Sequence, residues 1–182
     1  MDDARLVELV AHGDEDAFRL LVERHKSAAY NFFLRLSGSV EDAEDLTQEL
    51  FLKIYGAASR YRPEAPFRAY LYRIASNMAM SHLRKRKLRQ GVSLEEMREA
   101  GVDIASERRS DDPAAVFEGQ EAGRKYLRAL SRLPAQWRLA IELRAGRELS
   151  VGEIAAAMGR SPSAVESILF RARERIAEEM QK

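Results

Sequence analysis

Basic, aromatic and amide side chains gather in one stretch of this chain, residues 60–89. The stretch holds nine basic residues and one acidic residue. Cationic side chains bind phosphate, and each phosphate that they neutralise releases counterions from a nucleic acid. Aromatic rings stack on unpaired bases, and an asparagine amide can both donate to and accept from a base edge. The candidate residues for this chemistry are Arg60, Tyr61, Arg62, Arg68, Tyr70, Arg73, Asn77 and Arg84.

The aromatic residues of this stretch divide into two groups. Tyr61 stands between two arginines in a proline-containing segment that cannot be helical, which favours contact with DNA. Phe67 is spaced with Leu71 and Ile74 as on one face of a helix, which favours a place in the core.

An acidic segment precedes the basic one. Residues 41–49 include five acidic residues and no basic residue, so near neighbours cannot neutralise them. Two interpretations stay open from charge alone: a solvated helix face, or a docking surface for a basic region of another protein. The candidate contact residues on this helix are Asp42, Glu44, Asp45, Leu46, Gln48, Glu49 and Lys53.

The last third of the chain has the signature of a helix-turn-helix. Ser150 and Glu153 have the spacing of a capping box, and Gly159 suits the left-handed end of a short helix. Ser161 followed by Pro162 starts a second helix that carries basic residues. We expect DNA binding there, with an ordinary helical hairpin as the alternative. The candidate DNA contacts are Arg160, Ser161, Ser163, Glu166, Ser167, Arg171 and Arg173.

These side chains require helices to position them, and helical periodicity runs through most of the chain. The sequence therefore predicts an all-α protein of two small helical domains. Residues 1–90 form the first domain and residues 124–182 the second. Residues 91–123 have weak periodicity and an acidic bias, and they predict a flexible linker with one short helix around residues 94–100.

Composition narrows the function further. The chain of 182 residues has a net charge of +1 and no cysteine, so disulfides and thiolate metal sites are excluded. Its three histidines are scattered without metal-ligand spacing, and we expect no metal and no cofactor. No nucleotide-binding or nucleophile motif occurs, which predicts that the protein is not an enzyme. Neither a secretion signal nor a membrane-spanning run is present, so we expect a cytoplasmic location.

The ordered set of motifs resembles a known family. The segments 42–55, 67–77 and 83–87 resemble region 2 of extracytoplasmic-function (group 4) sigma factors of the sigma-70 family. The segments 133–138, 149–155 and 170–175 resemble region 4 of the same group. The resemblance covers nearly the whole chain except the linker, and the linker is too short for the middle domain of the larger sigma factors.

The resemblance implies a partner for each candidate surface. The helix of residues 42–55 would bind core RNA polymerase, residues 60–84 would open and read the −10 element as single-stranded DNA, and residues 150–173 would read the −35 element as duplex. An anti-sigma factor is the expected inhibitor. Members of the family often have basic residues where Glu166 and Ile168 stand here, so −35 affinity would be weaker or its sequence preference unusual.

Two other functions stay open at this point. A dimeric helix-turn-helix regulator of duplex DNA would account for residues 124–182 but would leave the acidic and basic helices of the first domain unused. A helical adaptor that binds only proteins would use the charged segments without DNA.

Overall fold

The chain folds into helices, as predicted. The computed structural model describes residues 1–62, 64–89, 121–145 and 149–181, and no strand occurs in these ranges. The first part contains α1 (Asp3–Ala11), α2 (Glu15–Ser37), α3 (Val40–Ala57), the short 3-10 helix η1 (Ala58–Arg60) and α4 (Phe67–Arg89). The second part contains α6 (Glu121–Ser131), α7 (Ala135–Arg144), α8 (Val151–Met158) and α9 (Pro162–Met180).

The predicted linker lies almost entirely outside the described residues, and so does its predicted short helix over residues 94–100. On its N-terminal side, α4 extends to Arg89. On its C-terminal side, α6 begins at Glu121, within the stretch that the sequence assigned to the linker.

Local capping fixes where the helices begin. The side chains of Ser39, Ser150 and Ser161 each accept a hydrogen bond from a backbone N–H in the first turn of the helix that follows. The Glu153 carboxylate accepts from the Ser150 backbone N–H at 2.7 Å, which completes the predicted capping box. Gly159 ends α8 with a φ of 62°, a conformation that favours glycine. The turn between α8 and α9 is therefore determined by local sequence.

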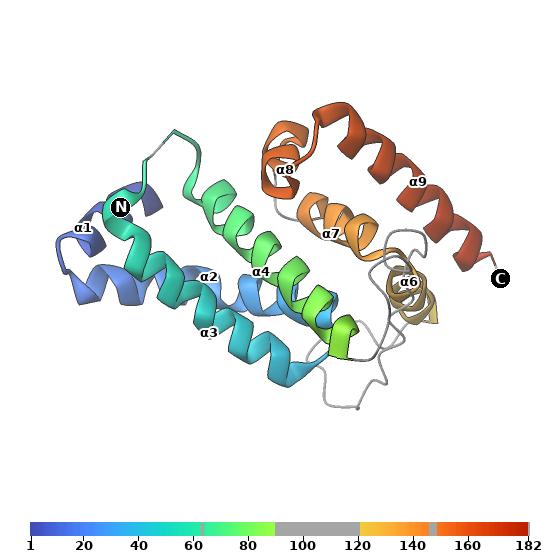
Figure 1. Ribbon diagram of the computed structural model, residues 1–182, viewed down its shortest axis with the longest axis horizontal. Helices are drawn as coiled ribbons and strands as arrows, with labels where there is room; N and C mark the ends of the chain where they lie inside the picture. The colour runs from blue at the N-terminus through green and yellow to red at the C-terminus, as the bar shows by residue number, and fades with distance from the viewer. Residues whose placement is uncertain (63, 90–120, 146–148, 182) are drawn as a thin grey trace.

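The first part is a bundle built on the antiparallel pair α2 and α3, with α4 packed against both (Figure 1). Phe32 and Phe33 of α2 and Leu50 of α3 have no exposed surface, and Leu71 of α4 is 1% exposed. Helix α1 packs against α2 and against η1, so it supports the segment that leads into the predicted DNA-reading loop. The candidate residues of the first domain are therefore held on a closely packed core.

The second part packs α6, α7 and α8 against the long helix α9. Leu133, Leu143, Val165 and Ala172 have no exposed surface and form the centre of this smaller core. Because α8 and α9 are joined by the capped turn at Gly159, they form the helix-turn-helix that the sequence predicts.

The two parts lie in contact with each other. Helix α8 packs against α4, and α7 packs against both α2 and α4 (Figure 1). Glu142 of α7 accepts a hydrogen bond from Arg35 of α2 at 2.6 Å, and its side chain is only 4% exposed. Arg138 and Lys87 are also buried at this contact, at 4% and 6% exposure. Burial and the neighbouring Arg138 both lower the pKa of Lys87. The contact therefore contains ionic groups as well as apolar ones.

The histidines interact with oxygen atoms of their neighbours. His12 Nδ1 lies 2.7 Å from the backbone oxygen of Glu8, and His25 Nε2 lies 2.8 Å from Asp3 Oδ2. Among the described side chains, no three His, Cys, Asp or Glu residues are grouped so as to hold a metal ion. The described helices also include none with the length and apolar character that a membrane span requires.

Candidate functional site

The acidic residues of α3 do not all point the same way. Asp42 lies toward α4, where its Oδ2 is 3.2 Å from His82 Nε2 and 3.8 Å from Arg86, although the histidine makes no hydrogen bond there. Leu46 is 7% exposed and belongs to the core. In this fold Leu46 fills the bundle interior and offers little surface to a partner, and its predicted contact with polymerase stays a prediction. Asp42 is half-buried and already lies near the Arg86 guanidinium.

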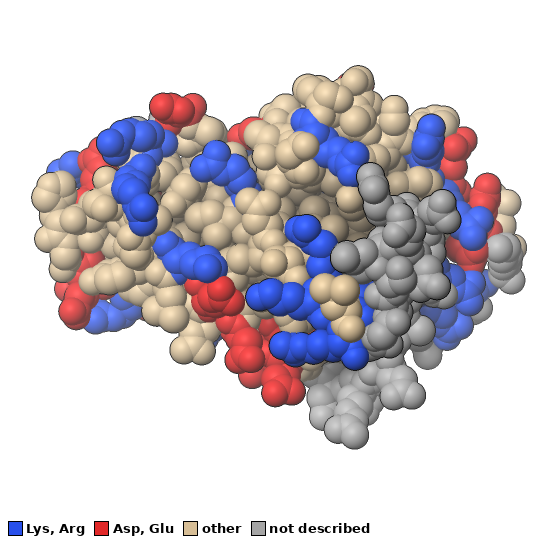
Figure 2. Space-filling view, in the orientation of Figure 1, with Lys and Arg blue, Asp and Glu red and all other residues tan. Residues whose placement is uncertain are grey.

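The remaining polar residues of α3 face solvent. Glu44, Asp45, Gln48 and Glu49 are exposed, and Lys53 forms an i, i+4 ion pair with Glu49 at 3.1 Å. Exposed pairs of this kind contribute little to stability. Figure 2 shows the carboxylates of α3 gathered beside the lysine and arginine side chains at the C-terminal end of α4. Acidic and basic surfaces therefore adjoin each other on one face of the molecule.

A groove of about 840 Å³ runs between α2 and α3. Glu44 and Gln48 line it, so two predicted contact residues border a concave and largely apolar surface. Leu52 lines it as well with 62% of its surface exposed, and Tyr55, 45% exposed, packs its ring edge-on against Phe18 at 5.0 Å. The apolar lining residues are Phe18, Val22, Tyr30, Phe51 and Leu52.

The sequence reading missed this groove. Leu52 and Tyr55 lie outside the apolar stripe that α3 buries. Two large apolar residues in such positions were the sequence feature that could have indicated an exposed apolar surface. Exposed apolar residues around a concavity are typical of a protein-binding surface.

Most of the predicted −10 residues are accessible. Arg60, Arg62, Arg73, Asn77 and Arg84 are exposed, and Arg68 and Tyr70 are half-buried. The guanidinium carbon of Arg73 lies 5.7 Å from the centre of the Tyr70 ring, which is a cation–π arrangement. The exposed face of α4 therefore carries basic groups and one amide.

Tyr61 is an exception. Contact with DNA was predicted for its side chain, which is 8% exposed and lies against Tyr70 and Phe67, with ring centres 5.0 and 6.2 Å away. Burial raises the pKa of the Tyr61 phenol, and the nearby Tyr70, Asp3 and Asp2 raise it further. The predicted DNA contact of Tyr61 stays a prediction, made for a ring that is packed within this aromatic cluster. Phe67 is 3% exposed, which confirms its predicted place in the core.

The predicted −35 residues lie on or next to the exposed face of α9. Ser163, Glu166, Ser167, Arg171 and Arg173 are exposed, whereas Val165, Leu169 and Ala172 on the opposite face are buried. Ser161 uses its hydroxyl to cap α9, and Arg160 hydrogen-bonds to Gln136 of α7.

Two further residues of α9 refine this surface. Ile168 packs against the core. Its side chain therefore has a packing role at the position where family members often have a basic residue. Phe170 is 63% exposed and shares the face of Ser163 and Ser167. The sequence reading treated this residue only as part of a family motif. A large apolar side chain on the solvent side of the recognition helix was the signal that it missed.

Comparison with known proteins accounts for both parts. Residues 21–89 match Sigma-70 region 2, and residues 123–176 match Sigma-70, region 4. The chain is 33% identical to the ECF RNA polymerase sigma-E factor of Escherichia coli strain K12, over 100% of this chain and 95% of the relative. The chain belongs to the extracytoplasmic-function group of the sigma-70 family. It is also 33% identical to the RNA polymerase sigma-H factor of Pseudomonas aeruginosa, over 98% of this chain and 94% of that protein.

Solved structures of similar proteins show the same fold. The sigma factor resembles CnrH in complex with the cytosolic domain of CnrY, with a TM-score of 0.71, 27% identity and coverage of 98% and 97% of the two chains. It also resembles the sigma factor RpoE in complex with the anti-sigma factor NepR from Bartonella quintana, with a TM-score of 0.70, 26% identity and coverage of 90% and 96%. The family membership identifies a transcription initiation factor, and it disfavours a regulator that acts without polymerase.

Proposed function

We propose that this sigma factor binds core RNA polymerase through α3 and the groove that α3 forms with α2. The observation that carries the proposal is the combination of exposed carboxylates with a largely apolar concave surface on the same helix. Glu44 and Gln48 would contact the partner at the groove, and Asp45 and Glu49 would meet basic side chains beside it. Carboxylates of this kind steer a basic partner and select it, while apolar contacts supply affinity.

The exposed face of α4 and the segment that precedes it read the −10 element in this proposal. Arg60, Arg62, Arg73 and Arg84 neutralise phosphates, and the Asn77 amide contacts a base edge. Tyr70 offers a half-buried ring on which an unpaired base can stack. Tyr61 lies against Tyr70 in the aromatic cluster and would contribute to this surface from that position.

The exposed face of α9 reads the −35 element in the major groove. Arg171 and Arg173 supply positive charge, while Ser163 and Ser167 offer hydroxyl groups along the helix. Glu166 can accept a hydrogen bond from a cytosine amine. Phe170 adds apolar contact, of the kind made with a thymine methyl group.

The chain works in the cytoplasm without catalytic activity of its own, and an anti-sigma factor controls it. Support for the inhibitor comes from the two solved relatives, which were captured with the cytosolic domain of CnrY and with the anti-sigma factor NepR. Such a partner would compete with polymerase for exposed surfaces of the first part.

Run-off transcription tests the central proposal. Core polymerase from the source bacterium is combined with this chain on a library of genomic fragments, and the start sites are mapped. We expect a discrete set of new start sites that share sequences near −10 and −35. Identical start sites with and without the chain would contradict the proposal.

A double substitution tests the polymerase-binding surface. Asp45→Arg with Glu49→Arg reverses two exposed charges, so we expect weaker binding to core polymerase with an unchanged melting temperature. Glu15→Arg with Glu23→Arg, at exposed positions on α2, is the matched control and should bind normally. Equal loss in both double variants would mean that only overall charge matters.

A further inference from the structure

We propose that Asp3 and His25 are positioning residues for promoter opening, because together they hold the aromatic cluster beneath the −10-reading loop. The inference rests on the proposed −10 role of residues 60–84. Neither residue belongs to the basic surface itself. Their effect would be transmitted through Phe67, whose ring contacts His25, Tyr61 and Tyr70.

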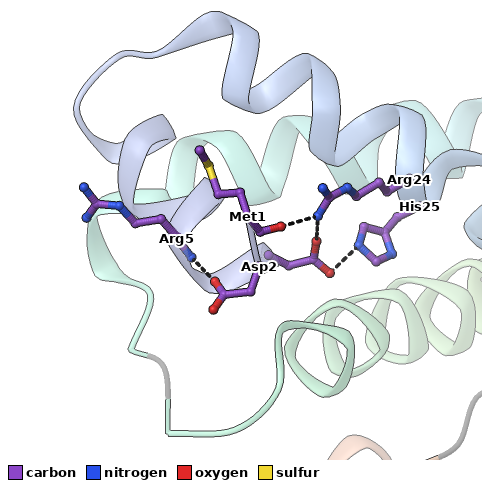
Figure 3. A network of polar contacts seen from close by, with 6 residues as sticks. Met1, Asp2, Arg5, Arg24 and His25 are labelled. Carbon is purple, nitrogen blue, oxygen red and sulfur yellow. Dashed lines mark hydrogen bonds and ion pairs between the residues drawn. The ribbon is translucent and has the colours of Figure 1, made fainter.

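The first link joins α1 to α2. Asp3 Oδ1 accepts a hydrogen bond from Arg24 at 2.9 Å, and Asp3 Oδ2 lies 2.8 Å from His25 Nε2 (Figure 3). The same Arg24 guanidinium nitrogen also donates to the backbone oxygen of Met1 at 3.0 Å. An ionised carboxylate only accepts, so Nε2 of His25 must carry a hydrogen. Arg24 and His25, which are consecutive residues of α2, therefore both donate to the Asp3 carboxylate of α1.

The second link joins His25 to the aromatic cluster. The imidazole ring packs edge-on against Phe67 with ring centres 5.2 Å apart. Its side chain is 20% exposed, so Asp3 on one side and Phe67 on the other leave it little freedom. Because Asp3 fixes one edge of the ring, it also fixes the surface that Phe67 meets.

The third link joins Phe67 to the reading surface. Phe67 contacts Tyr61 at 6.2 Å and Tyr70 at 6.3 Å between ring centres, and the two tyrosines contact each other. Tyr70 in turn lies under the Arg73 guanidinium. The Tyr61 hydroxyl reaches the backbone oxygen of Ala65 at 3.4 Å, so the cluster also touches the loop backbone. A change at Asp3 therefore propagates through contacting side chains to residues proposed to meet DNA.

The composition of the loop between η1 and α4 gives a reason for support from α1. The loop between η1 and α4 contains two prolines, which cannot donate backbone hydrogen bonds, so fewer of its residues can be held through the backbone. Helix α1 packs on η1 directly before this loop. The fold thus uses an element outside the DNA-reading surface to set the loop conformation.

Opening kinetics of the holoenzyme test the inference. The chain carries Asp3→Asn, which removes the charge, or His25→Phe, which keeps a ring against Phe67 but loses the bond to Asp3. The control is Asp16→Asn, which removes an exposed carboxylate paired with Arg19 on α2. The probe is a duplex promoter mapped by run-off transcription, with 2-aminopurine in the −10 element. A second template has the same sequence with a pre-opened bubble.

We expect both Asp3→Asn and His25→Phe to slow opening of the duplex about 3- to 10-fold. Affinity for core polymerase, activity on the bubble template and the control variant should stay within a factor of two of wild type. NMR signals of the Tyr61 and Tyr70 rings should shift in both variants and not in the control.

Two results would overturn the inference. One is normal duplex opening in both variants. The other is a loss of polymerase affinity or bubble-template activity by the same factor as duplex opening, which would indicate that the whole first part is destabilised. Failure of the proposed function looks different, because the wild-type chain itself would then not accelerate opening of the duplex by core polymerase.

Discussion

Arg35 of α2 donates from Nε to Glu142 of α7 over 2.6 Å, and this ion pair joins the region 2 part of the sigma factor to the region 4 part. The two residues are 107 positions apart in the sequence. Glu142 is nearly inaccessible, whereas about one third of the Arg35 side chain is exposed. Removing one partner of a buried pair leaves the other charge without compensation.

Arg35→Ala should therefore separate the two parts in solution. We expect a destabilisation of the closed arrangement of about 1–3 kcal/mol, below the value for a fully buried pair because Arg35 is partly solvated. Small-angle scattering should show a larger radius of gyration, and labels on α3 and α9 should move apart. Arg132→Ala is the control, because its ion pair with Glu179 lies inside the second part. Equal expansion of both variants would contradict the prediction.

Lys87→Met should have the opposite effect. The ammonium group is buried close to Arg138, and both conditions disfavour its charge, as its lowered pKa reflects. A group with a folded pKa below its unfolded value destabilises the fold at neutral pH, and the penalty disappears as pH rises toward the unfolded pKa. We expect a higher melting temperature for Lys87→Met at pH 7, with the difference shrinking as the pH approaches 10. A lower melting temperature at pH 7 would show that the charge has a favourable partner.

Asn77→Ala tests the proposed base reader on α4. The side chain is exposed, so its loss should leave stability within about 0.5 kcal/mol of wild type. Loss of one polar base contact should weaken capture of −10 single-stranded DNA by about 1–3 kcal/mol, with polymerase affinity unchanged. Fluorescence anisotropy with a labelled non-template strand measures this in the holoenzyme. Lys85→Ala, another exposed residue of α4, should behave as wild type apart from a slightly smaller salt dependence.

Phe170→Ala tests the apolar residue on the recognition face of α9. Because 63% of its surface is exposed, its loss should cost little stability. We expect about 3- to 10-fold weaker binding to a duplex containing the −35 sequence, an effect of the size seen for one lost base contact. Met180→Ala, at the far end of the same helix, serves as the comparison. A loss that is equal on specific and random duplexes would mean that Phe170 carries no sequence information.

Acid should weaken the attachment of α1. Burial tends to raise the pKa of Asp3, but hydrogen bonds from Arg24 and His25 and their charges outweigh it and lower the pKa below its ordinary value of 3.8. A carboxyl group with a lowered folded pKa stabilises the fold above its unfolded pKa, and this stability is lost as pH falls through the folded pKa. Urea unfolding of wild type and Asp3→Asn should differ at pH 6, and the difference should shrink as the pH falls below 3.8. A constant difference down to pH 2.5 would contradict this assignment.

Local sequence was enough to predict the helices and the turn of the second part. The capping box at Ser150 and the left-handed Gly159 depend only on neighbouring residues, and the structure confirms both. The inward face of α9 followed from the spacing of Val165, Leu169 and Ala172, which are all buried. Patterns that involve one helix or one turn can be read from a single sequence.

The features that the sequence did not reveal depend on contacts between segments that are distant in the sequence. Tyr61 stands between two arginines in the sequence, but in the fold its ring packs against Phe67 and Tyr70 of α4 and is 8% exposed. The groove beside Leu52 exists because α2 lies next to α3, and the Arg35–Glu142 pair depends on how the two parts meet. Sequence periodicity identifies the buried face of each helix, and it does not specify which partner covers that face.

The ionic composition of the contact between the two parts has a consequence for solubility. Arg35, Lys87, Arg138 and Glu142 regain hydration when the parts separate, which offsets some of the free energy lost in breaking the contact. An interface made only of leucine and phenylalanine would expose an adhesive surface on separation and would promote aggregation. We therefore expect separation of the two parts to expose charged as well as apolar groups, so that each part stays hydrated.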